Sequence, residues 1–414
     1  MSSSPTRPRV AIMFDALGPY HIARLNSAAR HLDVVAVEAS GASSDYAWDS
    51  VNGRYPFSRV TLFPRETIRK KAPEEVLSRV RDELTKASPD CVALPGWSEP
   101  ASLAALLWAR DAGKPAVLMT ESSAHDEPRR WWKEFVKSRI VSQFSAALAG
   151  GAPHVKYLNQ LGMENGRVFT GYDVIDNEYF ASRVAEVRRD ADYWRAKTNL
   201  PVNYFLASAR FIEKKNLPRL LEAFSIFRAR LQPSSPSEQP WSLVLLGDGP
   251  SAPDLRELAA KLSLGSSVLF PGFLQYGDLP VYYALASAFV HASTVEQWGL
   301  VVNEAMSASL PVIVSEPCGC APDLVHNGEN GFTFDPLSPS QLADFMVRVA
   351  SEEDMRRSMG AASLRIINEW GPQRFGHGLS QAANAARAHE SARLAPWDRA
   401  LLSTLIRRST RQET

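Results

Sequence analysis

The sequence predicts an α/β protein with two domains, each built on a doubly wound parallel sheet. The chain has 414 residues, which favours two domains at ~100–200 residues each. Short apolar runs alternate with helical patterns through both halves, an order typical of parallel sheets. Glycine turns follow the first apolar run and the run at 243–246, where such folds bind their ligands.

The composition is that of a soluble globular protein and excludes several classes. A net charge of +1 provides no global attraction to nucleic acid, so we expect no nucleic-acid partner. No apolar run approaches the ~20 residues of a membrane span, and the polar start 1–5 is not a signal peptide. Three cysteines favour a reducing compartment. We therefore expect a cytoplasmic protein, at most peripheral on the inner face of the membrane.

The first half begins with a predicted strand at 9–15, which is apolar as in a sheet covered on both faces. The turn Gly18-Pro19-Tyr20-His21 follows, and then a helix at 22–31. Further strands are expected at 33–37, 60–63, 91–94, 115–119, 146–149 and 168–171, with helices at 73–87 and 99–112.

The second half repeats this order after a polar helical stretch at 176–198, which we take as the domain junction. From 335 the chain is expected to be helical to about 393, with a break at 370–372. The domains expected are 1–180, 181–372 and a set of C-terminal helices at 373–414 that cross back onto the first. Strands are expected at 204–208, 243–246, 268–270, 288–290 and 312–314, with a helix at 217–231.

The stretch after 294 carries the strongest chemical signal. Glu296 and Glu304 stand eight positions apart, with Gly299 between them and a helical run from Leu300. A loop glycine that opens a helix leaves backbone N–H groups, such as that of Val301, free to face an anion. Glu304 would lie about one turn into that helix. A phosphate between two carboxylates indicates a nucleotide joined to a hydroxyl-rich group.

Two cations follow the predicted strand at 204–208. Arg210 and Lys215 are five positions apart, so one turn could aim both at a single diphosphate. Fixed cations would stabilise leaving-group charge in place of a metal, so we expect no metal ion and no cofactor. The alternative is a solvated pair on the surface.

The second half resembles retaining glycosyltransferase family 4, also called glycosyl transferases group 1. Glu296 and Glu304 match that family's Glu-x7-Glu signature. Four further stretches resemble its turns in the same order, at 208–216, 247–250, 271–273 and 327–332. The first half resembles the family more loosely, through 18–21 and 171–176. The resemblance covers about half of the chain and implies the GT-B architecture, in which two Rossmann-like domains face each other across a cleft.

The resemblance also implies an activity, namely retaining, metal-independent transfer of a hexose from a nucleotide diphosphate, with UDP favoured, to a hydroxyl group. The acceptor could be a glycan, a lipid-linked molecule or a small molecule. The catalytic residues would be Glu296, Arg210 and Lys215. Donor contacts would come from Gly18, Gly247, Phe273, Leu274, Gly299, Leu300, Val301 and Glu304.

Acceptor-side candidates follow predicted strands of the first half, and they are His21, Glu121, His125 and Asp126. In the family the leaving phosphate is thought to help deprotonate the acceptor on one face, so no protein nucleophile is implied. An inverting enzyme would need a base, which His125 with Asp126 could supply. For each of these residues a structural role is an equal alternative.

The stretch 129–139 predicts a basic helix with aromatic residues. It could lie on an anionic membrane surface or hold a phosphate-bearing lipid acceptor. The interpretation that we favour is that Trp131 or Trp132, Phe135 and Ile140 pack inward while the cations are solvated.

Two other functions remain open for the whole chain. A sugar-nucleotide epimerase or hydrolase could use the same fold, and an epimerase would need an acid and a base around the sugar. A binding protein without turnover is the third possibility. A protein that had lost its activity would not need to keep the charged residues of the site. The second half has all four, namely Arg210, Lys215, Glu296 and Glu304, which argues against this third possibility.

Overall fold

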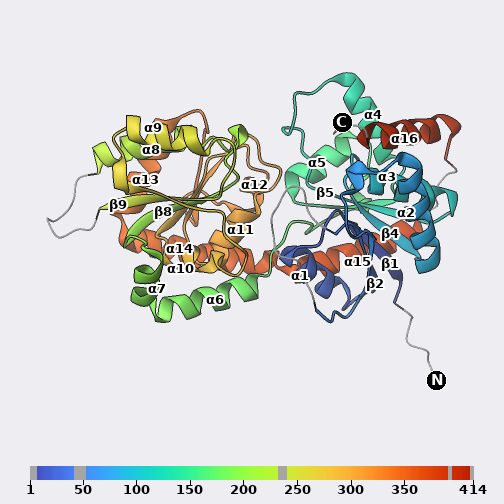
Figure 1. Ribbon diagram of the computed structural model, residues 1–414, viewed down its shortest axis with the longest axis horizontal. Coiled ribbons are helices and arrows are strands. Elements are labelled where there is room, and N and C mark those ends of the chain that lie inside the picture. Colours follow the sequence, from blue (N-terminus) through green and yellow to red (C-terminus); the bar gives the residue numbers. More distant parts are fainter. Residues whose placement is uncertain (1–6, 42–52, 232–239, 390–393, 411–414) are drawn as a thin grey trace. The chain divides into compact units, whose positions relative to one another are not determined.

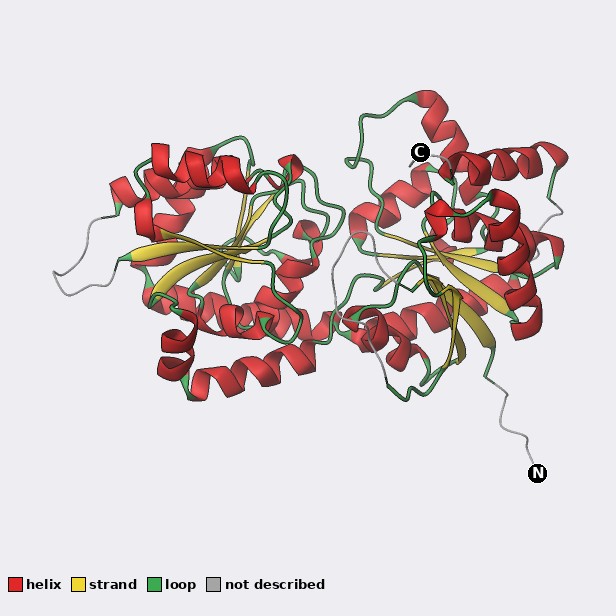
Figure 2. Ribbon diagram, viewed as in Figure 1, coloured by secondary structure: helices red, strands yellow, loops and turns green. Residues whose placement is uncertain are grey.

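The computed structural model describes residues 7–41, 53–231, 240–389 and 394–410. The chain divides into two compact units. Unit 1 contains Met1–Val174 and Pro372–Thr414, and unit 2 contains Ile175–Gly371. Each unit has a parallel sheet with helices on both faces (Figures 1 and 2). Residues 390–393 and 411–414 of the expected C-terminal helices lie outside the described residues.

The sheet of unit 1 has seven described strands in the order β3-β2-β1-β4-β5-β6-β7. The order reverses between β1 and β4, and the carboxyl ends of strands at such a reversal are where open α/β sheets bind ligands. The strands are β1 (Arg9–Phe14), β2 (Asp33–Ser40), β3 (Ser58–Phe63), β4 (Cys91–Pro95), β5 (Ala116–Thr120), β6 (Ala146–Ala149) and β7 (Val168–Thr170).

Alternate residues of β1 enter different cores, so both faces of this sheet are buried. Ala11 and Met13 belong to one cluster, and Val10 and Ile12 to the other. Helices α2, α3 and α16 lie over the first cluster, and α1 and α15 over the second (Figure 1). The helices of unit 1 are α1 (Pro19–Ala28), α2 (Pro73–Ala87), α3 (Pro100–Asp111), α4 (Trp131–Val141), α5 (Ala152–Gln160), α15 (Pro372–Ala388) and α16 (Pro396–Ser409).

Helix α15 belongs to unit 1, although unit 2 precedes it in the sequence, and it packs closely against α1. A Cβ atom on Gly376 would lie 2.5 Å from the Ser27 hydroxyl oxygen, well inside van der Waals contact. Glycine therefore allows the C-terminal segment to pack tightly on the first helix of the chain.

The sheet of unit 2 has six described strands in the order β10-β9-β8-β11-β12-β13, all parallel. This order reverses between β8 and β11. The strands are β8 (Asn203–Ser208), β9 (Trp241–Leu246), β10 (Val268–Gly272), β11 (Ala288–His291), β12 (Val312–Ser315) and β13 (Gly331–Phe334). The helices are α6 (Asn177–Arg189), α7 (Ala191–Thr198), α8 (Leu217–Arg230), α9 (Ala252–Lys261), α10 (Leu279–Leu285), α11 (Leu300–Ser307), α12 (Ala321–Leu324), α13 (Pro339–Ser351) and α14 (Glu353–Ile367).

Candidate active site in unit 2

The strongest candidate site lies at the carboxyl ends of β8, β11 and β12, three neighbouring strands at the reversal of the sheet. The loop after β8 carries Arg210 and Lys215, and the loop after β11 carries Glu296 and Gly299. The loop after β12 pairs with the loop after β11 through a β-bridge between Cys318 and Glu296. Segments far apart in the sequence therefore meet where α/β folds bind ligands.

Glu296 is the centre of this cluster. Its Oε2 atom accepts a hydrogen bond from the ammonium group of Lys215 and another from the Ser293 hydroxyl at 3.2 Å. The His291 Nε2 atom lies 3.0 Å from the same oxygen. The side chain of Glu296 is 11% exposed, so a nearly buried carboxylate is held from three sides and still reaches the surface.

The electrostatics keep this carboxylate ionised. Burial alone would raise the pKa of Glu296, but the hydrogen bond and charge of His291, together with Lys215, hold that pKa well below its usual range. Burial would lower the pKa of His291, but the neighbouring Cys318 and Glu296 raise it to about 9. At neutral pH the Glu296 carboxylate is therefore an anion in contact with Lys215 and His291.

Gly299 brings the start of α11 against this cluster. Its φ of +99° lies in the left-handed region that favours glycine. A Cβ atom here would lie 3.0 Å from the Cys318 sulfur and 3.3 Å from the Glu296 Cγ atom. Leu300 and Val301 form the first turn of α11, where backbone N–H groups lack partners within the helix. This turn can receive an anion beside Glu296.

Glu304 lies one turn further along α11 and is only 2% exposed. Its carboxylate is close to the hydroxyl of Tyr283, which is fully buried. Burial, followed by the charge of Glu304, raises the pKa of Tyr283 well above its ordinary value, so this tyrosine stays neutral. The second glutamate is therefore a buried acceptor on the same helix as the anion-binding turn.

The loop after β8 is shaped by Asn216. Asn216 has a φ of +57°, a conformation that asparagine tolerates better than most residues. Its side-chain amide donates to the carbonyls of Ala292 and Pro336, at 3.0 and 2.8 Å. Asn216 thus ties the Lys215 turn to the loop that carries Glu296. Arg210 lies on the exposed part of the same loop.

The remaining donor-site candidates of unit 2 follow β9 and β10. Gly247 has a φ of +124°, and a Cβ atom there would overlap the Ala209 carbonyl oxygen at 1.8 Å. It therefore allows the β9 turn to pack against the loop of Arg210. Phe273 is 42% exposed and Leu274 is half-buried, so both offer apolar surface at this edge.

Gly18 and His21 form a helix cap in unit 1. The Gly18 backbone N–H donates to the His21 Nδ1 atom at 3.0 Å, and the imidazole lies against Phe14 with ring centroids 4.4 Å apart. Burial, reinforced by the charge of Arg24, lowers the pKa of His21 to about 3. His21 is therefore a neutral imidazole that holds the loop after β1.

The other candidates of unit 1 follow β5. Asp126 accepts hydrogen bonds from the backbone and hydroxyl of Ser123, at 2.8 and 2.7 Å, so it closes a turn. His125 is exposed, and Glu121 interacts with the buried Asp173. Asp126 therefore pairs with Ser123.

Sequence reasoning missed several residues of these clusters. His291 is the last residue of β11 and the only polar one in that strand. A polar residue at the carboxyl end of an apolar strand was the sequence signal that could have identified it as a site residue. In unit 1, Gly151 donates to the Nδ1 atom of His154 at 3.0 Å, repeating the Gly18–His21 cap at the start of α5. The two Gly-x-x-His segments could have been found by comparing the turns after β1 and β6.

The expectation that the aromatic residues of 129–139 pack inward is wrong. Trp131, Trp132 and Phe135 are 83%, 47% and 62% exposed, while Ile140 alone of the expected set is buried. The cations are also not simply solvated. Lys133 pairs with Glu127 at 2.6 Å. Polar contacts from another side of α4 attach it to unit 1, including Lys137 to the Tyr157 hydroxyl at 3.0 Å and Ser138 to the Leu161 carbonyl at 2.7 Å, while its aromatic side remains outside.

Comparison with known proteins finds a family match within unit 2. Residues 190–365 match the family described as glycosyl transferases group 1. The match lies entirely inside unit 2. The matched segment contains every candidate residue of unit 2 described above.

The curated proteins that this chain resembles are named for different substrates or products. It is 30% identical over 169 residues to the GDP-mannose-dependent alpha-(1-6)-phosphatidylinositol monomannoside mannosyltransferase of Mycobacterium tuberculosis, covering 39% of this chain and 41% of that protein. It is 33% identical over 126 residues to the alpha-monoglucosyldiacylglycerol synthase of Acholeplasma laidlawii, covering 30% of each. The chain thus spans about two-fifths or less of these relatives.

Solved structures of glycosyltransferases share the whole fold. Sucrose-phosphate synthase from Thermosynechococcus elongatus aligns with a TM-score of 0.70 and 18% identity, covering 91% of this chain and 98% of that one. WaaG, a glycosyltransferase involved in lipopolysaccharide biosynthesis, aligns with a TM-score of 0.63 and 17% identity, covering 90% and 98%. The chain therefore has the GT-B fold of two Rossmann-like domains.

Proposed function

We propose that this protein is a retaining, metal-independent glycosyltransferase that moves a hexose from a nucleotide diphosphate, with UDP favoured, to a hydroxyl group. The carrying observation is the Glu296 carboxylate, contacted by Lys215, His291 and Ser293 beside the glycine that opens α11. A fixed carboxylate beside an anion-binding helix start suits a molecule that joins phosphate to hydroxyl groups.

Each group has a distinct role in the proposed transfer. The first turn of α11 binds the distal phosphate through its N–H groups, and Arg210 and Lys215 stabilise the charge that grows there as the glycosidic bond breaks. Glu296 accepts hydrogen bonds from hydroxyls of the donor sugar, and Glu304 from hydroxyls of the ribose. Lys215 exchanges part of its contact with Glu296 for the phosphate when the donor binds. The leaving phosphate takes the acceptor proton, and the new bond forms on the same face of the sugar.

The test is a transfer assay with UDP-sugars, followed by nucleotide release with and without acceptor extracts. Acceptor-dependent release of UDP, with a product of retained anomeric configuration, is expected. Release without acceptor would indicate a hydrolase, and interconversion of sugars would indicate an epimerase. Binding of UDP, GDP and ADP, measured by thermal shift, selects the base, because a ligand of the folded state raises its melting temperature. No shift with any nucleotide contradicts the proposal.

We further propose that the acceptor is lipid-linked and that α4 contacts the membrane surface. The support is the exposed aromatic set of Trp131, Trp132 and Phe135, joined by Trp397 of α16, which is 69% exposed. Helix α16 is tied to α4 by the ion pair Asp398–Arg139 at 2.6 Å.

Aromatic side chains favour the membrane interface. Both curated relatives named above act, by name, on phosphatidylinositol or diacylglycerol derivatives. Within the described part of the chain, no helix is both long and apolar enough to cross a membrane.

Sedimentation with vesicles tests this contact. The Trp131→Ala/Phe135→Ala variant should bind several-fold less to vesicles of phosphatidylglycerol and phosphatidylcholine than the parent protein. Tyr193→Ala, which removes an aromatic residue 52% exposed on unit 2, is the matched control and should bind normally. Because most cations of α4 are paired within the protein, binding should change little with salt. Unchanged binding of the double variant would refute the contact.

A further inference from the structure

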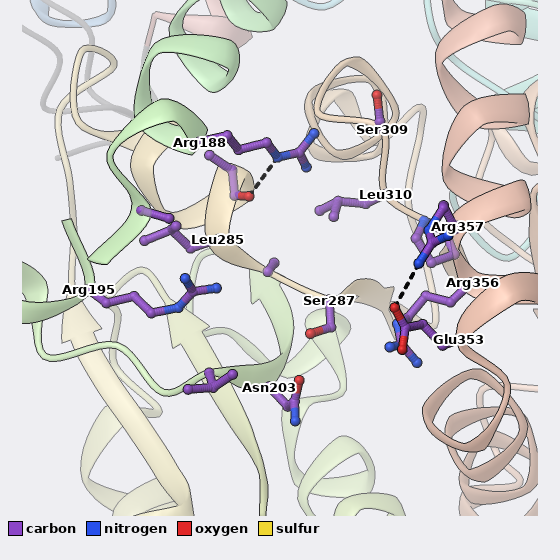
Figure 3. A pocket seen from close by; sticks show the side chains of 15 residues that line it. Arg188, Arg195, Asn203, Leu285, Ser287, Ser309, Leu310, Glu353, Arg356 and Arg357 are labelled. Carbon is purple, nitrogen blue, oxygen red and sulfur yellow. Dashed lines mark hydrogen bonds and ion pairs between the residues drawn. The ribbon is translucent and has the colours of Figure 1, made fainter. Parts of the chain in front are cut away.

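Unit 2 contains a cavity at the opposite end of its sheet from the candidate active site. Its volume is about 400 Å³, within the range of small-molecule sites (Figure 3). Asn203, which begins β8, lines it, and so do Ser287 and Pro311, which directly precede β11 and β12. The same three strands carry Lys215 and Glu296 beyond their other ends. A strand of six residues, such as β8, spans roughly 20 Å, so the two sites are separate.

The cavity is strongly cationic. Four arginines line it, and Glu353 is the only carboxylate among its lining residues. They come from three helices, Arg188 from α6, Arg195 from α7, and Arg356 and Arg357 from α14 (Figure 3). A concentration of positive charge from separate helices destabilises the empty site and favours an anion.

Two of the arginines are fixed by backbone carbonyls. Arg188 donates to the carbonyls of Ala284 and Ala308, at 2.9 and 2.6 Å. Arg356 donates to those of Val349 and Ala350, at 2.9 and 3.1 Å. Because neither pair of acceptors carries a charge, both guanidinium groups keep their full positive charge while their positions are set.

The other two arginines can engage a ligand directly. Arg195 lines the cavity, and its guanidinium group extends into it (Figure 3). The N–H groups at the end of that side chain can donate to an oxygen ligand. Arg357 pairs with Glu353 at 2.8 Å, and both side chains are well exposed, so this ion pair is weak and exchangeable.

We propose that this cavity binds the phosphate group of a small phosphorylated metabolite or of inorganic phosphate. Arginine guanidinium groups match phosphate geometry through paired N–H donors, and a phosphate monoester carries close to two negative charges near neutral pH. The guanidinium groups of Arg195 and Arg357 contact the phosphate, and Arg188 and Arg356 supply fixed positive charge around it. The hydroxyl of Ser287 lies on the same wall and offers a further polar group.

Calorimetric titration of the full-length protein tests this site. Inorganic phosphate and glycerol 3-phosphate are titrated separately, each with and without saturating UDP, which keeps any phosphate binding at the nucleotide site out of the measurement. The expected result is binding that persists in UDP. Tighter binding of glycerol 3-phosphate identifies an organic phosphate as the ligand, and equal binding identifies inorganic phosphate. Binding that disappears in UDP, or no binding at all, overturns the proposal.

Variants locate the binding within the cavity. Arg195→Gln and Arg357→Gln should each weaken binding at least ten-fold. The matched control is Arg365→Gln, because Arg365 is an exposed arginine of α14 that is paired with Glu329 and does not line this cavity. Glu353→Gln should strengthen binding several-fold, because it frees Arg357 and removes a negative charge. This gain cannot result from misfolding. Unchanged binding in Arg195→Gln, Arg357→Gln and Glu353→Gln would refute the site even if nucleotide transfer were demonstrated.

Discussion

The Glu296 carboxylate lies 3.0 Å from the His291 imidazole, and the two residues belong to one strand and the loop that follows it. Lys215 reaches the same oxygen from the neighbouring strand's loop. Lys215 and His291 therefore stabilise the negative charge of Glu296 in addition to hydrogen-bonding with it. This relationship leads to the first prediction.

Glu296→Gln should reduce the transfer rate by about 10²–10³-fold, because a neutral amide cannot replace a charged group that is ordered before the reaction. UDP affinity should change less than three-fold, since Glu296 is assigned to the sugar side of the donor. Steady-state kinetics and UDP titration measure the two effects. Full activity in the variant, or an equal loss of UDP binding, would remove Glu296 from this role.

Gly299→Ala should disrupt the start of α11. The left-handed φ costs an alanine about 1–3 kcal/mol, and its Cβ would crowd the Cys318 sulfur at 3.0 Å. We expect weaker UDP binding and a lower melting temperature. Gly265→Ala is the control, because Gly265 also has a left-handed φ, of +51°, but no atom within 4 Å of a Cβ. If both variants lose UDP binding equally, backbone strain alone explains the effect and the crowding is unimportant.

His21 should make unit 1 sensitive to acid. Its pKa in the folded state is about 3, below the ordinary value of 6.5. The stability that depends on its neutral form is therefore complete above about pH 6.5 and is lost as the pH falls toward 3. Between pH 6.5 and 5 the loss is roughly 2 kcal/mol for this group.

His21→Gln separates the cap from the titration. Glutamine at this position can still accept the Gly18 N–H but does not ionise. Hydrogen exchange of the α1 amides at pH 6.5 and 5 should show a smaller loss of protection in the variant than in the parent protein. His125→Gln, at an exposed histidine, is the control. Equal acid sensitivity of the parent and His21→Gln would show that another group is responsible.

Much of the fold could be predicted because its signals are local. The helix Pro73–Ala87 and the strand Ala146–Ala149 have the expected bounds, since a proline start and a short apolar run define them within a few residues. Gly299 at the start of α11 could also be predicted from the sequence, because the turn there needs a positive φ that favours glycine.

The rest depends on contacts between distant segments. No sequence pattern states that His291 and Lys215 converge on one oxygen of Glu296, because this requires the order in which β8 and β11 pair. Helical spacing places Trp131 and Phe135 near each other, but it does not say whether that side of α4 meets a core. Contacts with other elements decide this, such as Ser138 with the Leu161 carbonyl and Arg139 with Asp398, and the second joins residues 259 positions apart.

The last prediction concerns the buried ion pair of unit 1. Arg24 and Asp173 approach to 3.6 Å with side chains 4% and 3% exposed, and Arg24 also donates to the Val174 carbonyl at 3.1 Å. Burial raises the pKa of Asp173, opposed by the charges of Arg24 and His154. Arg24→Met should destabilise unit 1 by about 3–5 kcal/mol, because it leaves a buried carboxylate without its main cation.

A second substitution distinguishes charge from packing in this pair. Asp173→Asn, added to Arg24→Met, removes the isolated charge and should restore part of the stability, as the coupling between two contacting residues requires. Hydrogen exchange of amides in α1 and β7 measures the protection in each variant. A double variant no more stable than Arg24→Met would mean that the lost contacts of Arg24 with Val174 and with the Tyr172 ring, 5.2 Å away, outweigh the ion pair.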